Sequence, residues 1–195
     1  MFGYLKGKIE DLQATKTYID VNGVGYEVHI SLYTYEAIKN KKETKLYIYN
    51  HIREDQFILF GFESLEEKIA FEWLTSVSGI GAQTGRMILS SMTPEEVYKA
   101  IRQGNKKQLQ TVKGIGLKTA ERMILELKDK VPEIDVQIID SSPKHNTIEK
   151  DALNALVGLG IAKPIAEKTL KKVLKEKQNT IESVEALIKI ALKNL

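Results

Sequence analysis

Two glycine turns, 35 residues apart, carry the residue types in this chain that are best suited to binding a ligand. Gly79-Ile80-Gly81 lies in the stretch LTSVSGIGAQTGRMIL, and Gly114-Ile115-Gly116 lies in the similar stretch LQTVKGIGLKTAERMILEL. Each stretch predicts a short helix, a tight turn and a second helix. The first N–H groups of that second helix have no partner within the helix, so they can donate to a phosphate. Two such sites favour a nucleic-acid backbone over one small ligand.

The backbone around each turn is the predicted phosphate ligand. Glycine has no Cβ, so a phosphate can approach the turn glycines closely. The candidate donors are the amides directly after the turns, at Ala82, Gln83, Leu117 and Lys118. Ile80 and Ile115 are expected to point inward and anchor the turns. The alternative is that the glycines only allow tight turns between helices, but the repetition in register favours phosphate binding.

Positive side chains flank the two turns unequally. Lys113, Lys118 and Arg122 surround the second turn, and the last two share a helix face because they are four residues apart. Arg86 is the cation beside the first turn, one residue out of register with Arg122. Such side chains contact phosphates and do not read bases. The alternative is a solvated basic face whose cations pair with neighbouring glutamates of the same helix.

A charged tripeptide, Arg53-Glu54-Asp55, lies between two β-rich segments, YIYNHI and QFILFGF. This arrangement predicts the tip of a β-hairpin, and an ordinary charged turn is one interpretation. The other interpretation is functional. Two carboxylates at an exposed tip repel a phosphate backbone, so they would shape or separate nucleic-acid strands rather than bind them.

Residues 1–63 predict the barrel that would hold this tip. Alternation and β-rich composition indicate five strands, with a hairpin turn at Asn22-Gly23 and a helical piece, Tyr33–Asn40, between the third and fourth. The strand segments are Tyr4–Glu10, Lys16–Val21, Gly25–Ser31, Lys45–Arg53 and Gln56–Phe62. This order is typical of a small Greek-key barrel of the OB type. The tyrosines and phenylalanines of these strands are assigned to the barrel core.

Residues 64–131 predict a helical domain that holds both turns. Ser64 and Glu67 form a predicted capping box before a helix that begins at Leu65. Thr93 and Glu96 form a second one, with a proline at the first helical position, and Gly104 ends that helix. The expected helices span residues 65–77, 81–91, 94–102, 106–112 and 117–130. The domain is therefore a tandem helix-hairpin-helix.

The remaining residues predict a flexible linker, 132–147, and a small three-helix domain, 148–195, of the UBA-like kind. The expected helices are Ile148–Leu159, Lys163–Lys175 and Ile181–Leu195, the last capped at Asn179-Thr180. The apolar residues assigned to its core are Leu156, Leu159, Ile161 and Leu170. The whole chain is thus a multidomain α+β protein, in which the last domain suits docking to another protein.

Composition excludes several function classes. The 195 residues contain no cysteine, and the three histidines are far apart, so we expect no metal site and no cofactor. No nucleotide-binding loop, serine-hydrolase elbow or zinc-protease motif is present, so no catalytic residue is assigned. The net charge of +3 is concentrated in residues 65–131, which carry 11 basic and 8 acidic groups. Without a long apolar run or a signal peptide, the chain is expected to be cytoplasmic.

Three blocks of sequence also resemble the RuvA family of DNA-binding proteins: MFGYLKGKI, HIREDQFILFGF and VKGIGLKTAERMILELKDK. The resemblance covers essentially the whole chain. It implies a non-catalytic homotetramer that holds four-way (Holliday) junction DNA open, with one or two tetramers on each junction. It further implies that the C-terminal domain contacts RuvB, the hexameric ATPase that drives branch migration in recombination and DNA repair. The RuvC nuclease is implied as a further partner.

The resemblance also assigns roles to particular residues. The acidic pin of the family falls on Glu54 and Asp55, and its phosphate-binding turns fall on Gly79–Gly81 and Gly114–Gly116. One departure concerns the first turn. Members of the family often have a proline and a lysine where this chain has Ala82 and Gln83, so the first turn is expected to depend mainly on its amides.

Two other functions remain open at this point. A DNA glycosylase of the helix-hairpin-helix class would need a catalytic aspartate after the second turn, and the candidates are Asp135 and Asp140 in the predicted linker. A single-strand-binding barrel would use the aromatic residues of 1–63 as stacking platforms. The net charge of −1 over residues 1–64, from 8 basic and 9 acidic groups, disfavours this second alternative, because such grooves are basic.

Overall fold

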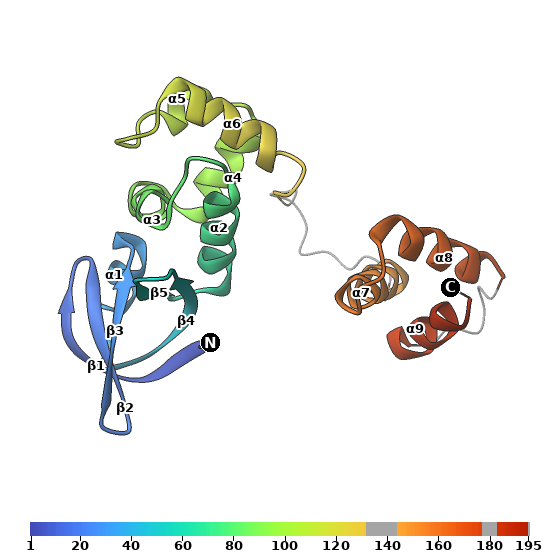
Figure 1. Cartoon of the computed structure of the whole chain (residues 1–195), viewed down its shortest axis with the longest axis horizontal. Helices are drawn as coiled ribbons and strands as arrows, with labels where there is room; N and C mark the ends of the chain where they lie inside the picture. Colours follow the sequence, from blue (N-terminus) through green and yellow to red (C-terminus); the bar gives the residue numbers. More distant parts are fainter. Residues whose placement is uncertain (132–143, 177–182, 195) are drawn as a thin grey trace. The chain divides into compact units, whose positions relative to one another are not determined.

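A computed structural model describes residues 1–131, 144–176 and 183–194 of the chain. The chain forms two compact units, Met1–Ile134 and Asp135–Leu195. The first unit contains the barrel and both glycine turns, and the second contains the C-terminal helices (Figure 1). Any element that positions the turns relative to the hairpin tip therefore lies within the first unit.

The first unit begins with a closed five-stranded barrel whose neighbours run in the order β1-β2-β3-β5-β4. The strands are β1 (Tyr4–Gln13), β2 (Lys16–Val21), β3 (Val24–Ile30), β4 (Glu43–Ile52) and β5 (Phe57–Phe62). Strands β3 and β5 pair in parallel and the other neighbours pair antiparallel. Helix α1 (Leu32–Ile38) lies between β3 and β4 in the chain, which confirms the predicted Greek-key barrel of the OB type.

Backbone conformation confirms the predicted hairpin turn and explains why β1 ends later than predicted. Asn22 and Gly23 have φ angles of 53° and 87°, which confirms the predicted hairpin turn. Strand β1 was expected to end at Glu10 but continues to Gln13. The pairing of β1 with β2 shifts register between Glu10 and Gln13, and Asp11 there has φ 45°. The register shift lets β1 continue to pair with β2 beyond Glu10.

Five helices follow the barrel in the first unit: α2 (Leu65–Ser76), α3 (Ala82–Ser91), α4 (Pro94–Arg102), α5 (Lys106–Leu109) and α6 (Leu117–Leu127). Thr93 and Glu96 form the predicted capping box, and Gly104 has φ 64° just after α4 ends. Two predicted bounds were wrong. Helix α5 has four residues rather than seven, and α6 ends three residues before the predicted position 130.

The predicted capping box at the start of α2 is only half correct. The Ser64 hydroxyl accepts a hydrogen bond from the Glu67 amide, but the Glu67 side chain does not return to the cap. Instead it is fully buried and accepts hydrogen bonds from the hydroxyls of Ser31 and Thr34, at the start of α1. Burial raises the pKa of Glu67 to about 7, against the opposing effect of these two hydrogen bonds.

The barrel and the helices share a core through strand β5. Leu59 belongs to the barrel core, whereas Phe60 and Phe62 belong to the core of the helices. The rings of Phe60 and Phe62 lie 5.2 and 4.8 Å from that of Phe71 on α2, measured between centroids. The assignment of the strand aromatics to the barrel core was therefore wrong for these two, and also for Tyr4 and Phe57, which are 57% and 56% exposed.

The second unit is a bundle of α7 (Lys144–Gly158), α8 (Lys163–Glu176) and α9 (Val184–Lys193). Leucine and alanine residues fill its core: Ala152, Leu156, Ala166, Leu170, Leu187 and Ala191. Leu156 and Leu170 are buried as expected, and Ile161 is partly buried against the core. Leu159, however, is 64% exposed, because it lies in the connection after the end of α7 rather than on its inner face.

The helix bounds of this bundle also differ from the expectation. Helix α7 begins at Lys144, four residues before the predicted start, so the last residues assigned to the linker are helical. Helix α9 begins at Val184, with the Ser183 hydroxyl accepting from the Ala186 amide. The predicted cap at Asn179-Thr180 and residues 132–143 of the predicted linker lie outside the described residues.

Candidate nucleic-acid interface

The two glycine turns have the same backbone geometry. Gly79 and Gly114 have φ angles of 91° and 89°. Gly81 and Gly116 have φ/ψ angles of −83°/171° and −84°/172°. Equivalent hydrogen bonds hold each turn, for example from the Ile80 amide to the Val77 carbonyl and, 35 residues later, from Ile115 to Val112, at 3.0 and 3.1 Å. The repeat seen in the sequence is therefore a repeat of structure.

The four glycines serve two different purposes. Gly79 and Gly114 adopt the left-handed conformation, which a side chain would strain, so the turn itself requires glycine there. Gly81 and Gly116 are extended, and a Cβ added to either would meet no atom within 4 Å. The packing of this chain therefore gives no reason for glycine at these two positions. Close approach of a ligand to the backbone would be a reason for glycine at both positions.

The N-termini of α3 and α6 differ in their caps from other helices of the chain. Helices α1, α2, α4, α5 and α9 each begin with a serine, threonine or asparagine whose side chain accepts from a helix amide. Gly81 and Gly116 begin α3 and α6 without any side-chain cap. The first amides of both helices thus remain available as donors, and the helix dipole adds positive potential there.

The anchors of the turns are placed as the sequence predicts. Ile80 and Ile115 are 4% and 5% exposed, and both belong to the hydrophobic core of the helices. The residues after the turns differ between the copies. Ala82 is buried, whereas Leu117 is 51% exposed. Gln83 and Lys118, at the next position, are both exposed, and their amides are the second ones of their helices.

The cations around the second turn are not neutralised by the glutamates of their own helix. Glu121 pairs instead with Lys106, at 2.8 Å, so the alternative of a solvated, glutamate-paired face was wrong for this residue. Lys113 and Lys118 are exposed and make no ion pair within the described part of the chain. Arg122 is directed at the first turn: its Nη1 donates to the Ser78 carbonyl at 2.9 Å.

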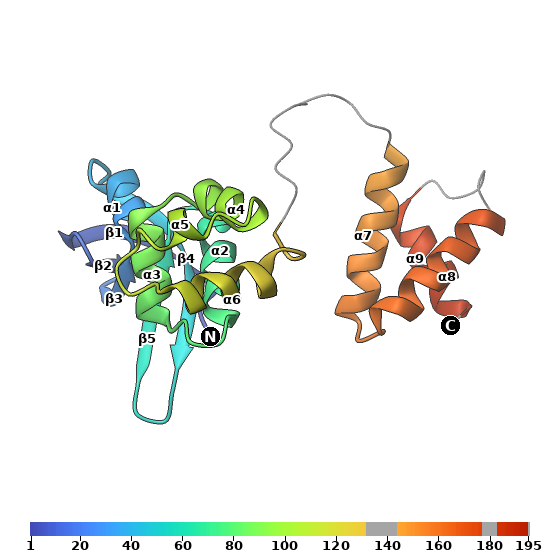
Figure 2. The same ribbon diagram turned by 90° about the horizontal axis from the view of Figure 1, so that it is seen from above.

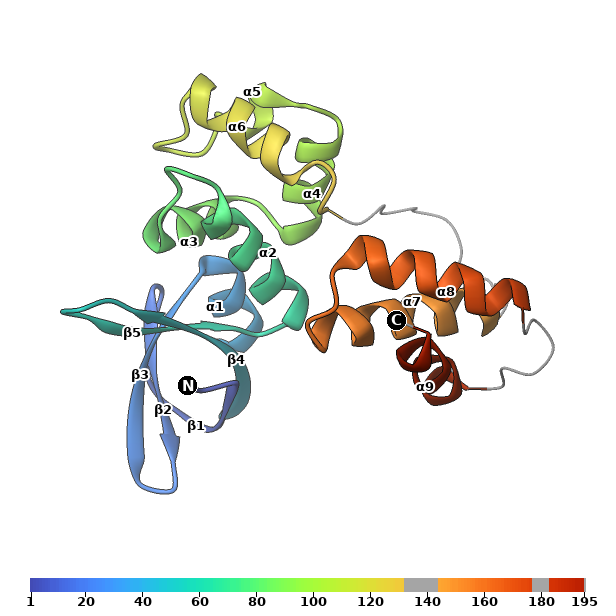
Figure 3. The same cartoon turned by 45° about the vertical axis from the view of Figure 1, so that its right-hand side comes forward.

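This contact brings the two turns together, which the sequence did not indicate. In Figure 3 the α2–α3 and α5–α6 connections lie next to each other, at the left-hand edge toward which the β4–β5 hairpin also points. The Arg122 guanidinium lies so close to the first turn that a Cβ on Gly79 would be 3.7 Å from its Nη1. A cation of α6, the helix that follows the second turn, thus lies against the first turn.

Arg86 does not lie as the sequence suggests. Its Nη1 donates to the Thr15 carbonyl in the β1–β2 turn at 2.9 Å and lies 3.4 Å from His29 Nδ1 on β3. The side chain is therefore engaged with the barrel. The prediction of a phosphate contact by Arg86 remains untested, but its observed partners favour a structural role.

The acidic tip is a free hairpin end, as predicted. The Arg53 amide donates to the Gln56 carbonyl at 2.8 Å, which closes the turn around Glu54 and Asp55. Both carboxylates are exposed, and neither is among the ion pairs of the described residues. Figure 2 shows the β4–β5 hairpin projecting from the barrel. The tip thus carries two unneutralised negative charges, which would repel phosphate.

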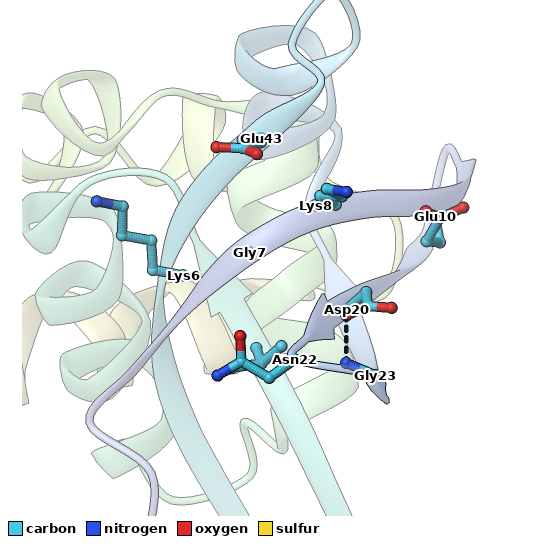
Figure 4. Close-up of a pocket in the computed structure, with 9 residues that line it drawn as sticks. Lys6, Gly7, Lys8, Glu10, Asp20, Asn22, Gly23 and Glu43 are labelled. Atoms are coloured by element: carbon cyan, nitrogen blue, oxygen red, sulfur yellow. Dashed lines mark hydrogen bonds between the residues drawn. The ribbon is translucent and has the colours of Figure 1, made fainter.

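The described residues contain no group of three or more histidine, aspartate or glutamate side chains that could hold a metal ion. A pocket of about 520 Å³ lies on the outer surface of the barrel (Figure 4). It is lined by Lys6, Lys8, Glu10, Asp20 and Glu43, and Asp20 is already used to accept from the Gly23 amide at 2.8 Å. Its mixed charges do not select one ligand.

Comparison with known proteins identifies the family. Residues 1–61 match the family described as RuvA N terminal domain, and residues 147–195 match RuvA, C-terminal domain. A relative from Cytophaga hutchinsonii, described as "Holliday junction branch migration complex subunit RuvA", is 45% identical over 199 residues that cover 99% of each chain. The chain belongs to the RuvA family. Relatives of the same description from Bacteroides thetaiotaomicron and Amoebophilus asiaticus are 43% and 44% identical, over 99% or more of each chain.

The RuvA match includes both parts of the candidate interface. Residues 71–129 match the family described as SAM-like Helix-hairpin-helix tandem, and this range contains both glycine turns. The acidic tip falls within the RuvA N-terminal match. Asp135 and Asp140, the candidate catalytic residues of a glycosylase, lie outside the described residues and outside all three matched ranges. Within the described residues, every helix is too short or too polar to span a bilayer.

Proposed function

We propose that this protein binds four-way junction DNA by its shape and serves as the non-catalytic DNA-binding subunit of a branch-migration complex. The observation that carries the proposal is the pair of identical, uncapped glycine turns on the same compact unit as an unneutralised acidic hairpin tip. Attraction at two turns and repulsion at one tip suit a branched DNA better than a plain duplex. The relatives support this, since all three are described as Holliday junction branch migration complex subunits.

The turns would hold the phosphate backbone. The amides of residues 82–83 and 117–118 donate to phosphate oxygens, with Gly79–Gly81 and Gly114–Gly116 allowing the close approach. Lys113, Lys118 and Arg122 add positive charge, and the Arg122 side chain already contacts the first turn at the Ser78 carbonyl. These contacts carry no sequence information, so selectivity would come from DNA shape, and affinity would fall steeply with salt.

The tip would act by repulsion. Glu54 and Asp55 would lie where the arms of the junction meet and keep the strands apart. Because the tip and the turns belong to one compact unit with a shared core, the distance between them is fixed by the fold. This rigidity would allow a multimer to present several copies of the same pattern to the arms of a junction.

Assembly and partners extend the proposal. We infer a homotetramer, with one or two tetramers on each junction, that acts with the RuvB ATPase and shares the junction with the RuvC nuclease in the cytoplasm. In this scheme, residues 1–63 hold the pin, residues 64–131 hold the turns, and the bundle that begins with α7 at Lys144 contacts the motor. Exposed apolar residues around the α7–α8 connection suit a protein contact: Val157, Leu159 and Ile165.

A DNA glycosylase is the competing proposal, and it is not favoured. The relatives carry the name of a complex subunit over nearly their whole length. The candidate catalytic aspartates of a glycosylase, Asp135 and Asp140, lie outside all three family matches. A glycosylase would also cleave a damaged base from a duplex without any partner, which is a simple assay.

One experiment tests the proposed function. The affinities for a four-way junction, a duplex and a single strand are compared by gel shift at matched salt, and the mass of the free protein is measured by light scattering. We expect a strong preference for the junction and a mass near four chains. Equal affinity for junction and duplex, or a stable monomer, would contradict the proposal.

A further inference from the structure

Helix α3, which begins at the first glycine turn, is hydrogen-bonded to the β1–β2 turn of the barrel and to the first residue of α1. The Arg86 Nη1 donates to the Thr15 carbonyl at 2.9 Å, and the Leu32 amide donates to the Ser90 Oγ at 3.0 Å. Arg86 and Ser90 are four residues apart and therefore share one face of the helix. Residues 15 and 32 flank the β2–β3 hairpin in the chain and lie at its open end, where the Ile30 amide also donates to the Thr15 carbonyl at 3.0 Å. The two contacts together hold one face of α3 against this end of the hairpin.

The partners of Arg86 on the barrel form a connected polar group. His29 Nδ1 lies 3.4 Å from Arg86 Nη1, and its Nε2 lies 3.4 Å from Glu27 Oε1. Glu27 also accepts from Tyr18 at 2.5 Å and from Lys16 at 3.2 Å. With a proton on Nε2, the neutral His29 donates to Glu27 and accepts from Arg86, so one tautomer satisfies both contacts.

The charge state of His29 fits this arrangement. Burial, followed by the nearby Arg86 charge, lowers the pKa of His29 below its ordinary value. The ring is therefore neutral at physiological pH and leaves a lone pair for the guanidinium. Both contacts use Nη1, whose two N–H groups can serve the two acceptors. A lysine nitrogen lies one bond closer to the backbone and would fall short of this position.

We propose that Arg86 is a positioning residue that sets the first glycine turn at a fixed place relative to the acidic hairpin, and thereby supports discrimination of junction from duplex. The inference rests on the proposed function. A duplex needs only the turns, whereas a junction must meet the turns and the tip at the same time. Freedom of α3 on the barrel would thus weaken junction binding and leave duplex binding unchanged.

The first test separates positioning from phosphate contact. Arg86→Lys keeps the positive charge, but its ammonium lies one bond short of the Nη1 position and so of both barrel acceptors. Lys118→Gln is the matched removal of a proposed phosphate ligand. For Arg86→Lys we expect about a tenfold loss of junction affinity, a duplex affinity within about twofold of the parent and an unchanged salt dependence. For Lys118→Gln we expect weaker binding of both DNAs and a smaller salt slope, by about 0.9 for each phosphate that is no longer neutralised.

The second test needs no DNA. Spin labels at Glu10→Cys on the barrel and Ser91→Cys on α3 are possible without interference, because the chain has no cysteine of its own. The full-length labelled protein, diluted with unlabelled protein, should give a narrow distance distribution that broadens in Arg86→Lys. The distance distribution reports how firmly α3 is held on the barrel, even if Arg86→Lys also changes the measured DNA affinities by lowering stability.

The outcomes distinguish the two proposals. If the parent protein does not prefer the junction, the proposed function fails, whatever Arg86 does to the label distances. If the parent prefers the junction but Arg86→Lys retains that preference and the narrow distribution, the positioning role is refuted. Equal losses of junction and duplex affinity in Arg86→Gln, with a smaller salt slope and with both affinities preserved in Arg86→Lys, would make Arg86 a phosphate contact instead.

Discussion

Gly116→Ala separates ligand approach from turn formation. At this position the backbone is extended, with φ −84°, and a Cβ would meet no atom within 4 Å. The folded chain therefore accepts alanine without strain. Gly114→Ala, two residues earlier, would instead place a side chain at φ 89° and strain the turn by about 1–2 kcal/mol. Gly116→Ala is thus the cleaner probe of the interface.

The expected cost to folding is small, because two effects offset each other. Alanine is a poorer N-cap than glycine, by roughly 0.5–1 kcal/mol. Alanine also reduces the freedom of the unfolded chain, which stabilises the protein by about 0.4–1 kcal/mol. The net change in the free energy of unfolding should lie within about 1 kcal/mol, which corresponds to a shift in melting temperature of no more than about 4 °C for a chain of this size.

The expected cost to binding is larger. The added methyl group lies beside the first amides of α6, at the surface where a phosphate oxygen would approach. A hydrogen bond to a charged group contributes about 1.5–3 kcal/mol. Loss of one such bond at each copy raises the dissociation constant about tenfold or more, since 1.4 kcal/mol is a factor of about ten.

The assay is the affinity for a four-way junction, measured at one salt concentration together with a thermal melt. Gly25→Ala is the matched control: it lies on β3, away from the turns, its Cβ would also meet nothing within 4 Å, and its φ is not positive. Unchanged junction affinity in Gly116→Ala, or an equal loss in Gly25→Ala, would refute the inference that phosphate approaches Gly116. A large loss of thermal stability would refute the packing argument.

Three further predictions concern other parts of the chain. Glu54→Lys combined with Asp55→Lys should keep or tighten junction binding while altering motor-driven branch migration, and loss of junction binding in a gel shift would contradict a repulsive tip. The folded pKa of Glu67, about 7, is raised above the ordinary 4.5, so its contribution to stability is present below pH 4.5 and lost as pH rises through 7. In Glu67→Gln, the free energy of unfolding should lack this decline, which amounts to about 3 kcal/mol between pH 4.5 and 7. The same pH dependence in both proteins would refute the raised pKa. Leu159→Glu should abolish stimulation of the motor ATPase with junction affinity intact, because the side chain is 64% exposed and outside the bundle core; normal stimulation would exclude this surface.

Local sequence preferences account for most of the fold. The positions of the five strands along the chain, the hairpin at Asn22-Gly23, the helix after Thr93 and the repeated turns all follow from alternation, caps and glycine. These signals act over a few residues, so a single sequence carries them. The misjudged ends, such as the short α5 and the early start of α7, depend on how far a helix can continue before packing stops it.

The contacts of individual side chains were harder to predict than the secondary structure. Glu67 has the spacing of a capping box, yet it lies in the core because α1 presents two hydroxyls to it. Phe60 alternates like a barrel residue, yet it packs on α2 because both faces of β5 are covered. Arg86 follows the first glycine turn closely in the sequence, yet its guanidinium contacts the barrel. In each case the deciding partner comes from an element distant in sequence.

By itself, the sequence located the two glycine turns and the acidic hairpin tip, because turn conformation and hairpin position depend on local residue types. Only the tertiary structure decided that Arg122 of α6 contacts the first turn, that Gly81 and Gly116 have no packing reason to be glycine, and that turns and tip belong to one unit. The physical reason is that direction and spacing between distant segments come from shared cores and long-range hydrogen bonds. No short stretch of sequence contains both partners of such a contact.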